Sequence, residues 1–269
     1  MIDWIVALQR PWLLPKYRLI NPFLPKTGNR TAKVYGATFD LDLSDLIQRK
    51  VFVGCYERNE TVIFRRLLRP GQTLLDVGAN IGYFTALGAQ LVTSTGKVIC
   101  VEPNPTAFKK LKAMIDRNKL SQCTPVNIGL SKEAGSITLF EPPIEHHNLN
   151  STMVPTAGYK PIDVAIRTLD EILDEHGVRQ VDLMKVDVEG HEPKVFSGGA
   201  RSLESGKIRH ILCEFNQPWL EQANSSSKAL LAMLKDFGFD VISGAGKEDD
   251  LSQYPIVNLL LKKKQSSAS

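Results

Sequence analysis

The chain has 269 residues, of which 43% are hydrophobic, and its formal net charge is +4. This composition can supply the buried core of one large domain, or of a domain with an extension. The small charge excess lies mainly near the two ends, without a dense basic stripe or interleaved aromatic residues, and this argues against a dedicated nucleic-acid-binding protein. No run approaches the ~18 apolar residues expected of a membrane-spanning helix.

Cysteine usage indicates a reducing environment. Cys55, Cys100, Cys123 and Cys213 are widely spaced and form no CxxC pair. Cys100 and Cys213 lie within apolar runs, so we expect them to be buried as small hydrophobic side chains. The start of the chain lacks the basic segment and small-residue cleavage site of a secretion signal. These features together predict a cytoplasmic protein.

The N-terminal part differs in pattern from the rest of the chain. The first 30 residues are rich in Pro, Trp and Leu and predict an irregular arm. Residues 34–53 alternate between polar and apolar, which predicts a hairpin or a short sheet, and residues 56–68 have helical spacing. We therefore predict an N-terminal arm with a small hairpin and helix (1–70), a main domain (71–264) and a disordered tail (265–269).

The main domain is predicted to alternate strands with helices. Strands are expected at 73–78, 97–103, 124–128, 136–142, 162–168, 181–190, 208–215, 240–244 and 255–263. Helices are expected at 81–92, 105–120 with Asn104 as its N-cap, 169–176, 193–203 and 225–237, and a polar loop at 143–161. Several strands are continuous apolar runs, which is typical of a parallel sheet covered by helices on both faces. The fold class predicted is a doubly wound α/β domain.

The first strand–helix connection of this domain is the expected ligand site, because open α/β sheets bind ligands outside the carboxyl ends of their strands. Gly78 and Gly82 follow a GxxxG pattern there, and Asn80 occupies the place of the middle glycine of a dinucleotide-binding GxGxxG loop. Asp76 precedes the loop, and a carboxylate would repel a diphosphate. S-adenosylmethionine instead carries an ammonium and a sulfonium group, so the loop favours this cofactor.

Two later strand ends extend the predicted cofactor site. Glu102 ends the second strand, where an acidic residue can accept both ribose hydroxyls. Asn127 ends the third strand and is predicted either to lie near the adenine or to serve as a turn residue. The predicted cofactor-binding residues are Asp76, Gly78, Asn80, Gly82, Tyr83, Glu102, Asn127 and Asp187.

Several segments of the chain resemble the FkbM family of S-adenosylmethionine-dependent methyltransferases, in the order in which the family has them. They are FDLDLSDLIQRKVFVGCYE, LLDVGANIGYFT, VEPNP, RTLDEIL and LMKVDVEGHEPKVFSGG, within residues 35–215. The resemblance implies a Rossmann-like class I methyltransferase fold, with a mostly parallel seven-stranded sheet whose last strand is antiparallel. It also implies O-methylation of a hydroxyl on a glycan, a polyketide-type metabolite or another secondary metabolite.

The run Lys185–Glu192 follows the fourth core strand and carries the predicted catalytic groups. An alcohol is a poor nucleophile while it keeps its proton, so a base or a metal ion is expected to assist. Asp187 and Glu189 point the same way if strand geometry persists through them. Gly190 is expected to need a positive φ or to allow a close approach.

His191 is the first candidate for the general base, because its ordinary pKa near ~6.5 leaves it mostly neutral at cytosolic pH. Glu189 is the rival base, and Glu192 is predicted to orient the imidazole. The alternative is that residues 191–193 are only the polar start of a helix.

A metal site is a further alternative at the neighbouring strand end. Glu214 and Asn216 are predicted to face Asp187, and two carboxylates with an amide suit Mg²⁺. The same groups can instead hold substrate hydroxyls. The polar segment 146–152 is predicted to be either a substrate lid or an exposed loop, and Trp219 is a candidate contact of the acceptor.

Other functions are less compatible with these motifs. A nicotinamide-dependent reductase or epimerase is disfavoured by Asp76, by Asn80 and by the lack of a clear YxxxK pair. The [DN]PP[YF] motif typical of nucleic-acid N-methylation is replaced by DVEG. A methyltransferase for a lipid or protein, and a non-catalytic cofactor-binding module, remain open. The predicted partners are S-adenosylmethionine and a small-molecule or glycan acceptor, with no nucleic acid and no integral membrane segment.

Overall fold

The computed structural model describes residues 25–141, 159–243, 251 and 254–264. Its main sheet has seven strands in the order β11-β12-β10-β9-β3-β4-β5. The strands are β3 (Thr73–Val77), β4 (Lys97–Val101), β5 (Cys123–Val126), β9 (Leu183–Val186), β10 (His210–Asn216), β11 (Phe239–Ser243) and β12 (Ile256–Lys263). β12 runs antiparallel to both of its neighbours, and the other pairs are parallel. The predicted sheet, antiparallel last strand included, is confirmed.

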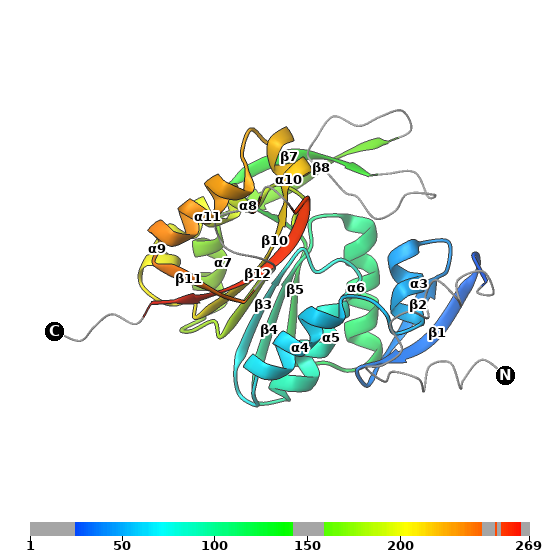
Figure 1. Cartoon of the computed structure of the whole chain (residues 1–269). Coiled ribbons are helices and arrows are strands. Elements are labelled where there is room, and N and C mark those ends of the chain that lie inside the picture. The colour runs from blue at the N-terminus through cyan, green and yellow to red at the C-terminus, as the bar shows by residue number, and fades with distance from the viewer. Residues whose placement is uncertain (1–24, 142–158, 244–250, 252–253, 265–269) are drawn as a thin grey trace.

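Helices cover both faces of this sheet (Figure 1). One face carries α4 (Arg58–Leu67), α5 (Tyr83–Val92) and α6 (Pro105–Arg117), and the other carries α7 (Leu169–Glu175), α8 (Glu192–Ser197), α9 (Ala200–Glu204) and α11 (Ser227–Asp236). Alternate residues of each strand serve the two faces: Leu74 packs with the first layer, and Leu75 and Val77 pack with the second. This period of two decides which side chains of a strand reach which layer.

Local capping chemistry explains where the helices begin. The Asn104 side chain accepts hydrogen bonds from the backbone N–H groups of Thr106 and Ala107, which confirms it as the N-cap of α6. The single helix expected over 193–203 is wrong, because α8 and α9 are separate. Between them lies Gly198, where a Cβ would come within 2.0 Å of the Ser131 carbonyl oxygen.

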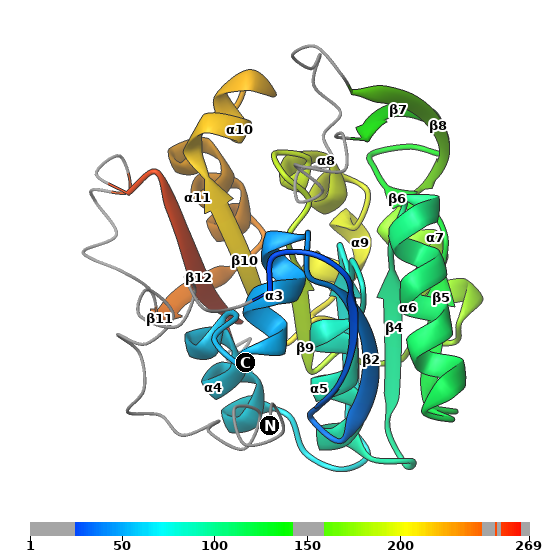
Figure 2. The same cartoon turned by 90° about the vertical axis from the view of Figure 1, so that its right-hand side faces the viewer.

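The N-terminal extension forms a hairpin followed by a helix. β1 (Asn29–Val34) pairs antiparallel with β2 (Ala37–Asp42), and α3 (Leu46–Phe52) follows. The hairpin prediction is confirmed, but its continuation to residue 53 is wrong, because Asp45 caps a helix by accepting from the Gln48 N–H. A short apolar run fits both the two-residue period of a strand and the 3.6-residue period of a helix, and here the N-cap decides for the helix. Figure 2 shows the hairpin and α3 in front of the main sheet, on the side that carries α4, α5 and α6. β1 packs against α5 and β2 against α6, and hairpin side chains share the core of the first layer.

Three strands near the carboxyl ends of the main sheet form a separate sheet in the order β6-β8-β7. They are β6 (Gly129–Leu130), β7 (Gly135–Glu141) and β8 (Lys160–Arg167). The predicted strands at 136–142 and 162–168 therefore exist, but they pair with each other. α10 (Gln217–Gln222) was not predicted. Most of the predicted loop at 143–161, the first 24 residues and the predicted tail lie outside the described residues.

Within the described ranges, no helix combines the length and the apolar character needed to cross a bilayer. Cys100 and Cys213 are fully buried, as expected, and none of the four cysteines is in a disulfide.

Candidate active site

A cavity of about 730 Å³ opens where the parallel strands end. Its wall is formed by the loops after β3, β4, β9 and β10, with further residues from α3, α10, β7 and the segment before α4. A volume of this size suits a small ligand of several hundred daltons. The cavity lies at the strand ends, where open α/β sheets bind their ligands.

The glycine loop after β3 is folded tightly against the neighbouring strand ends. Gly78 has φ +80°, and a Cβ on it would lie 1.9 Å from the carbonyl oxygen of Asp187. Its N–H and that of Ala79 both donate to the Val101 carbonyl oxygen at 3.0 Å. Asn80 also has a positive φ, of 49°. Gly78 and Asn80 line the cavity, as the sequence predicted for cofactor-binding residues.

Glu102 fixes this loop from the end of β4. Its two carboxylate oxygens accept hydrogen bonds from the backbone N–H groups of Asn80 and Asn104, each at 2.8 Å. It lines the cavity although it is only 5% exposed, and burial raises its pKa to about 7. Each oxygen of a carboxylate can accept more than one hydrogen bond, so Glu102 can still receive the hydroxyls of a ribose.

Asn127 acts as a turn residue at the end of β5. Its side-chain amide donates to the carbonyl oxygens of Glu102 and Pro103, at 2.8 and 3.1 Å. It is exposed and is not among the residues that line the cavity. Of its two predicted roles, the structure supports the turn over the adenine contact.

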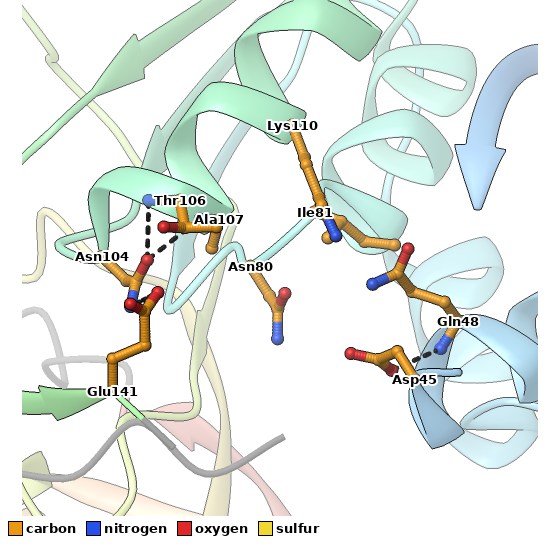
Figure 3. A pocket seen from close by; sticks show the side chains of 9 residues that line it. All are labelled: Asp45, Gln48, Asn80, Ile81, Asn104, Thr106, Ala107, Lys110 and Glu141. Atoms are coloured by element: carbon orange, nitrogen blue, oxygen red, sulfur yellow. Dashed lines mark hydrogen bonds between the residues drawn. The ribbon is translucent and has the colours of Figure 1, made fainter. Parts of the chain in front are cut away.

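A smaller hollow adjoins the other side of Asn80 (Figure 3). Residues from α3 and α6 line it, among them Gln48 and Lys110, together with the N-cap Asn104. Its volume of about 30 Å³ leaves room for about one water molecule. The large cavity is therefore the one that can accept a cofactor.

Asp76 is placed differently from the sequence prediction. It is 1% exposed, it faces the α4–α6 layer with Leu74, and it is not part of the cavity wall. Thr85 donates to one of its carboxylate oxygens at 2.7 Å, and the other is buried without a hydrogen-bond partner among the described residues. Burial raises its pKa, and the charge of Lys185, its register partner on β9, opposes that rise. The sequence predicted that the positive charge near Asp76 would be that of the cofactor. In the structure this charge is that of Lys185.

Gly82 and Tyr83 also differ in their roles. Gly82 does not line the cavity, and a Cβ on it would lie 2.5 Å from Met114 and 2.7 Å from Leu111, so it serves the packing of α5 on α6. Tyr83 lines the cavity, and its hydroxyl lies 2.6 Å from that of Tyr35 in the hairpin. A direct cofactor contact therefore stays a prediction for Tyr83 and is not supported for Gly82.

Three carboxylates converge on the cavity, two from the turn after β9 and one from β10. Asp187, Glu189 and Glu214 each offer an oxygen within 4.8 Å of the others. The strand geometry assumed in the sequence argument does not persist, because β9 ends at residue 186 and Glu189 has φ 51°. Gly190 has φ +91°, and a Cβ on it would lie 2.7 Å from the Trp219 carbonyl oxygen, so both of its expected properties are confirmed.

A lysine and three carboxylates act on one another in this cluster. The Lys185 Nζ atom lies 2.9 Å from an oxygen of Asp187 and 4.9 Å from the centre of the Phe84 ring. Burial, followed by the charge of Asp187, raises the pKa of Glu189 to about 9 and that of Glu214 to about 8. Such a cluster can hold a hard divalent cation or the hydroxyls of a substrate. Asn216 lines the cavity and donates to Glu214 at 3.4 Å.

His191 lies at the cavity wall but is largely buried. It is 7% exposed, its Nε2 atom is 3.2 Å from the Ser131 hydroxyl, and burial lowers its pKa to about 4. The expectation that Glu192 orients the imidazole is wrong. One oxygen of Glu192 accepts instead from the N–H groups of Val188 and Gly190 and so holds the turn.

The chain is similar in sequence to a known family of proteins. Residues 76–241, more than half of the chain, match the family model described as the methyltransferase FkbM domain. The chain belongs to the FkbM family of S-adenosylmethionine-dependent methyltransferases. It is 33% identical over 217 residues to the hexuronic acid methyltransferase AglP of Haloferax volcanii, covering 78% of this chain and 82% of that one.

Two further comparisons bear on activity and fold. The chain is 30% identical over 203 residues to the 2-O-methyltransferase NoeI of Sinorhizobium fredii, covering 69% of this chain and 80% of that one. A solved structure described as a putative rRNA methylase from Clostridium thermocellum superposes with a TM-score of 0.51 at 12% identity, covering 78% of this chain and 96% of that one. This structural likeness shows the fold alone, which is that of a class I methyltransferase.

Glu57 and Trp219 also line the cavity of this methyltransferase. Glu57, just before α4, lines the cavity but was not among the predicted site residues. Its only signal in the sequence is its position at the end of the family-like segment that finishes in GCYE. Trp219 on α10 lines the cavity, as its candidate role requires. The predicted lid at 146–152 lies outside the described residues.

Proposed function

We propose that the enzyme transfers the methyl group of S-adenosylmethionine to a hydroxyl of a sugar, free or within a glycan, or of a polyketide-type metabolite. One observation carries the proposal: a single cavity has Glu102 on one side of β3 and three clustered carboxylates on the other. The relatives whose names specify a hexuronic acid and a 2-O position support an alcohol of a sugar as the acceptor.

The residues of the cavity fit this cofactor. When bound, S-adenosylmethionine supplies an electrophilic methyl group on a positively charged sulfur. Glu102 would hold the ribose hydroxyls, the glycine loop at Gly78 and Asn80 would lie against the ligand, and Asp187 would face its ammonium group. Carboxylates on both sides of the loop favour a cationic ligand over a diphosphate.

The clustered carboxylates would bind and orient the acceptor hydroxyl. We assign to Glu189 the role of accepting the proton of the acceptor hydroxyl, because its Oε2 atom is buried without a hydrogen-bond partner in the described part of the chain. A positive charge within about 4–6 Å lowers the pKa of a carboxyl group, so a cationic ligand nearby would make Glu189 able to accept a proton. Asp187 would fix the orientation, and His191 is the alternative base. Correct alignment alone can contribute up to ~7–11 kcal/mol.

Mg²⁺ binding is a second proposed role of the same cluster. Asp187, Glu189 and Glu214 would be its ligands, with Asn216 next to Glu214. A divalent cation would lower the pKa of a bound hydroxyl and relieve the repulsion among the carboxylates. In that form Glu189 would be a ligand, and His191 would remain as the base.

Location and the choice of partner complete the proposal. We infer a cytoplasmic protein that acts on no nucleic acid. Four free cysteines support a reducing compartment. The mild net charge of +4, without a dense basic stripe, supports an acceptor other than nucleic acid.

The test is transfer from S-adenosylmethionine labelled in its methyl group to methyl glycosides of a neutral hexose, a hexuronic acid and an amino sugar. The expected result is a labelled product with one added methyl group on oxygen, located by mass spectrometry and NMR. The variant Glu102→Gln is expected to give much less product. Labelling of none of the glycosides, or methylation on nitrogen or carbon only, would overturn the proposed acceptor class.

A further inference from the structure

Glu57 has a backbone conformation that its residue type disfavours. Its φ of 34° and ψ of 61° lie in the left-handed region, which residues with a Cβ rarely adopt. Strained residues of this kind concentrate at active sites. Helix capping does not explain the choice of glutamate, because the side chain makes no capping hydrogen bond although Glu57 is the N-cap of α4.

The surroundings hold this conformation in place. The backbone N–H and the hydroxyl of Thr61 both donate to the Glu57 carbonyl oxygen, at 3.1 and 3.0 Å. The Tyr83 hydroxyl donates to the carbonyl oxygen of Tyr56 at 2.9 Å, and the Tyr35 hydroxyl lies 2.6 Å from that of Tyr83. The hairpin, α4 and α5 therefore fix the segment that carries Glu57.

The Glu57 side chain lies with the acceptor-side carboxylates. It lines the same cavity as Asp187, Glu189 and Glu214. Burial and the charge of Asp187 are the main causes of the raised pKa of Glu214, and the charge of Glu57 adds to them. The charges of Lys185 and Asp187, at the end of β9, act on Glu57 in turn. In the main sheet, β9 and β10 lie on the side of β3 opposite to β4, which carries Glu102 to the proposed ribose position.

We propose that Glu57 is an acceptor-binding residue, whose carboxylate accepts a hydrogen bond from a hydroxyl of the acceptor and so determines which acceptors bind. The proposal rests on the proposed sugar methylation. It gives the N-terminal extension a direct part in the active site, since the other acceptor-side carboxylates come from the turn after β9 and from β10. It also accounts for a strained glutamate where glycine would suit the backbone.

Two variants and one matched control test this. Glu57→Gln keeps the shape of the side chain and removes its charge. Glu57→Gly removes the side chain and relieves the backbone, so the fold is expected to be kept and the melting temperature to stay or rise. The control is Glu60→Gln: Glu60 lies on the same helix, is buried, accepts from Asn258 at 2.9 Å and does not line the cavity.

The measurement is the KM for each methyl glycoside that the unchanged enzyme methylates, beside the Kd for S-adenosylmethionine by calorimetry. Both Glu57 variants are expected to raise the acceptor KM about 10- to 100-fold, as for a hydrogen bond to a charged group, and to leave the cofactor Kd unchanged. Glu60→Gln is expected to change neither.

Three results would overturn the inference. An unchanged acceptor KM in both variants would show that Glu57 does not bind the acceptor. A weaker cofactor Kd together with a lower melting temperature in Glu57→Gly would show that Glu57 has a structural role. Labelling of no glycoside by the unchanged enzyme would overturn the proposed function itself, and the inference with it.

Discussion

Gly78 and Asp187 approach each other so closely that no side chain fits between them. A Cβ on Gly78 would lie 1.9 Å from the Asp187 carbonyl oxygen, and the φ of Gly78 is +80°. The contact joins the glycine loop after β3 to the end of β9. It therefore sets the position of the proposed cofactor loop relative to the carboxylates that would hold the acceptor.

Gly78→Ala is expected to destabilise the protein by about 2–4 kcal/mol and to weaken S-adenosylmethionine binding at least tenfold, because the two strand ends must separate. Urea unfolding and calorimetry measure the two effects. Gly36→Ala is the matched control, since Gly36 has φ +79° and an added Cβ there meets nothing within 4 Å. Equal losses in the two variants would show that the close approach has no role.

Glu189→Gln is expected to lower kcat about 10²- to 10⁴-fold, because it removes the proposed proton acceptor. His191→Gln is expected to cost less, because the pKa of the buried imidazole is about 4 and makes it a weak base. Steady-state kinetics with a methyl glycoside provides the comparison. A larger loss in His191→Gln, with an acid limb of the rate profile near pH 4, would assign the base to His191.

The ligand-free enzyme is expected to lose stability as pH rises from 6.5 to 8.5. The pKa values of Glu189 and Glu214 are about 9 and about 8 in the folded state, against an ordinary value of 4.5, so the folded state binds more protons over this interval. Over this interval the free energy of unfolding falls by on the order of 2–3 kcal/mol for each proton that the folded state binds and the unfolded state does not. Urea unfolding in metal-free buffer measures this fall. The free energy of unfolding should depend less steeply on pH in Glu189→Gln. Stability that increases over this interval would contradict the burial of these carboxyl groups.

The Mg²⁺ role predicts that millimolar Mg²⁺ raises the melting temperature of the unchanged enzyme, because a ligand of the folded state stabilises it. Glu189→Gln removes one of three candidate ligands and should abolish most of the increase, while Glu60→Gln should keep it. If Mg²⁺ raises the melting temperature equally in all three proteins, or does not raise that of the wild-type enzyme, the cluster does not bind Mg²⁺ and serves the acceptor only.

Much of the fold could be predicted because its signals are local. The apolar run of β3, the glycine loop and the start of α5 follow one another in the sequence, and Asn104 followed by Pro105 marks the start of α6. The residues after β4 and β9 were expected at the cavity, because parallel strands end at the same edge of a sheet. Glu102 and Asp187 do line it.

The remaining differences depend on long-range packing. Asp76 was assigned to the cofactor from its charge, but it lies on the face of β3 that meets α5, where Lys185 from the adjacent strand is near. Strand register alone brings these two residues together. Glu57 reaches the cavity through contacts of its segment with α5 and the hairpin, and no local pattern encodes them. The separate sheet of β6, β7 and β8 likewise depends on pairing partners, which hydrophobic periodicity does not specify.

The cofactor site is tested by a calorimetric titration of the purified enzyme with S-adenosylmethionine and, separately, with NAD⁺. We expect saturable binding of S-adenosylmethionine only, weakened about 10- to 100-fold in Glu102→Gln and unchanged in Glu60→Gln. Binding of NAD⁺ would contradict the identity proposed for the cofactor, and unchanged S-adenosylmethionine binding in Glu102→Gln would contradict its placement against Glu102.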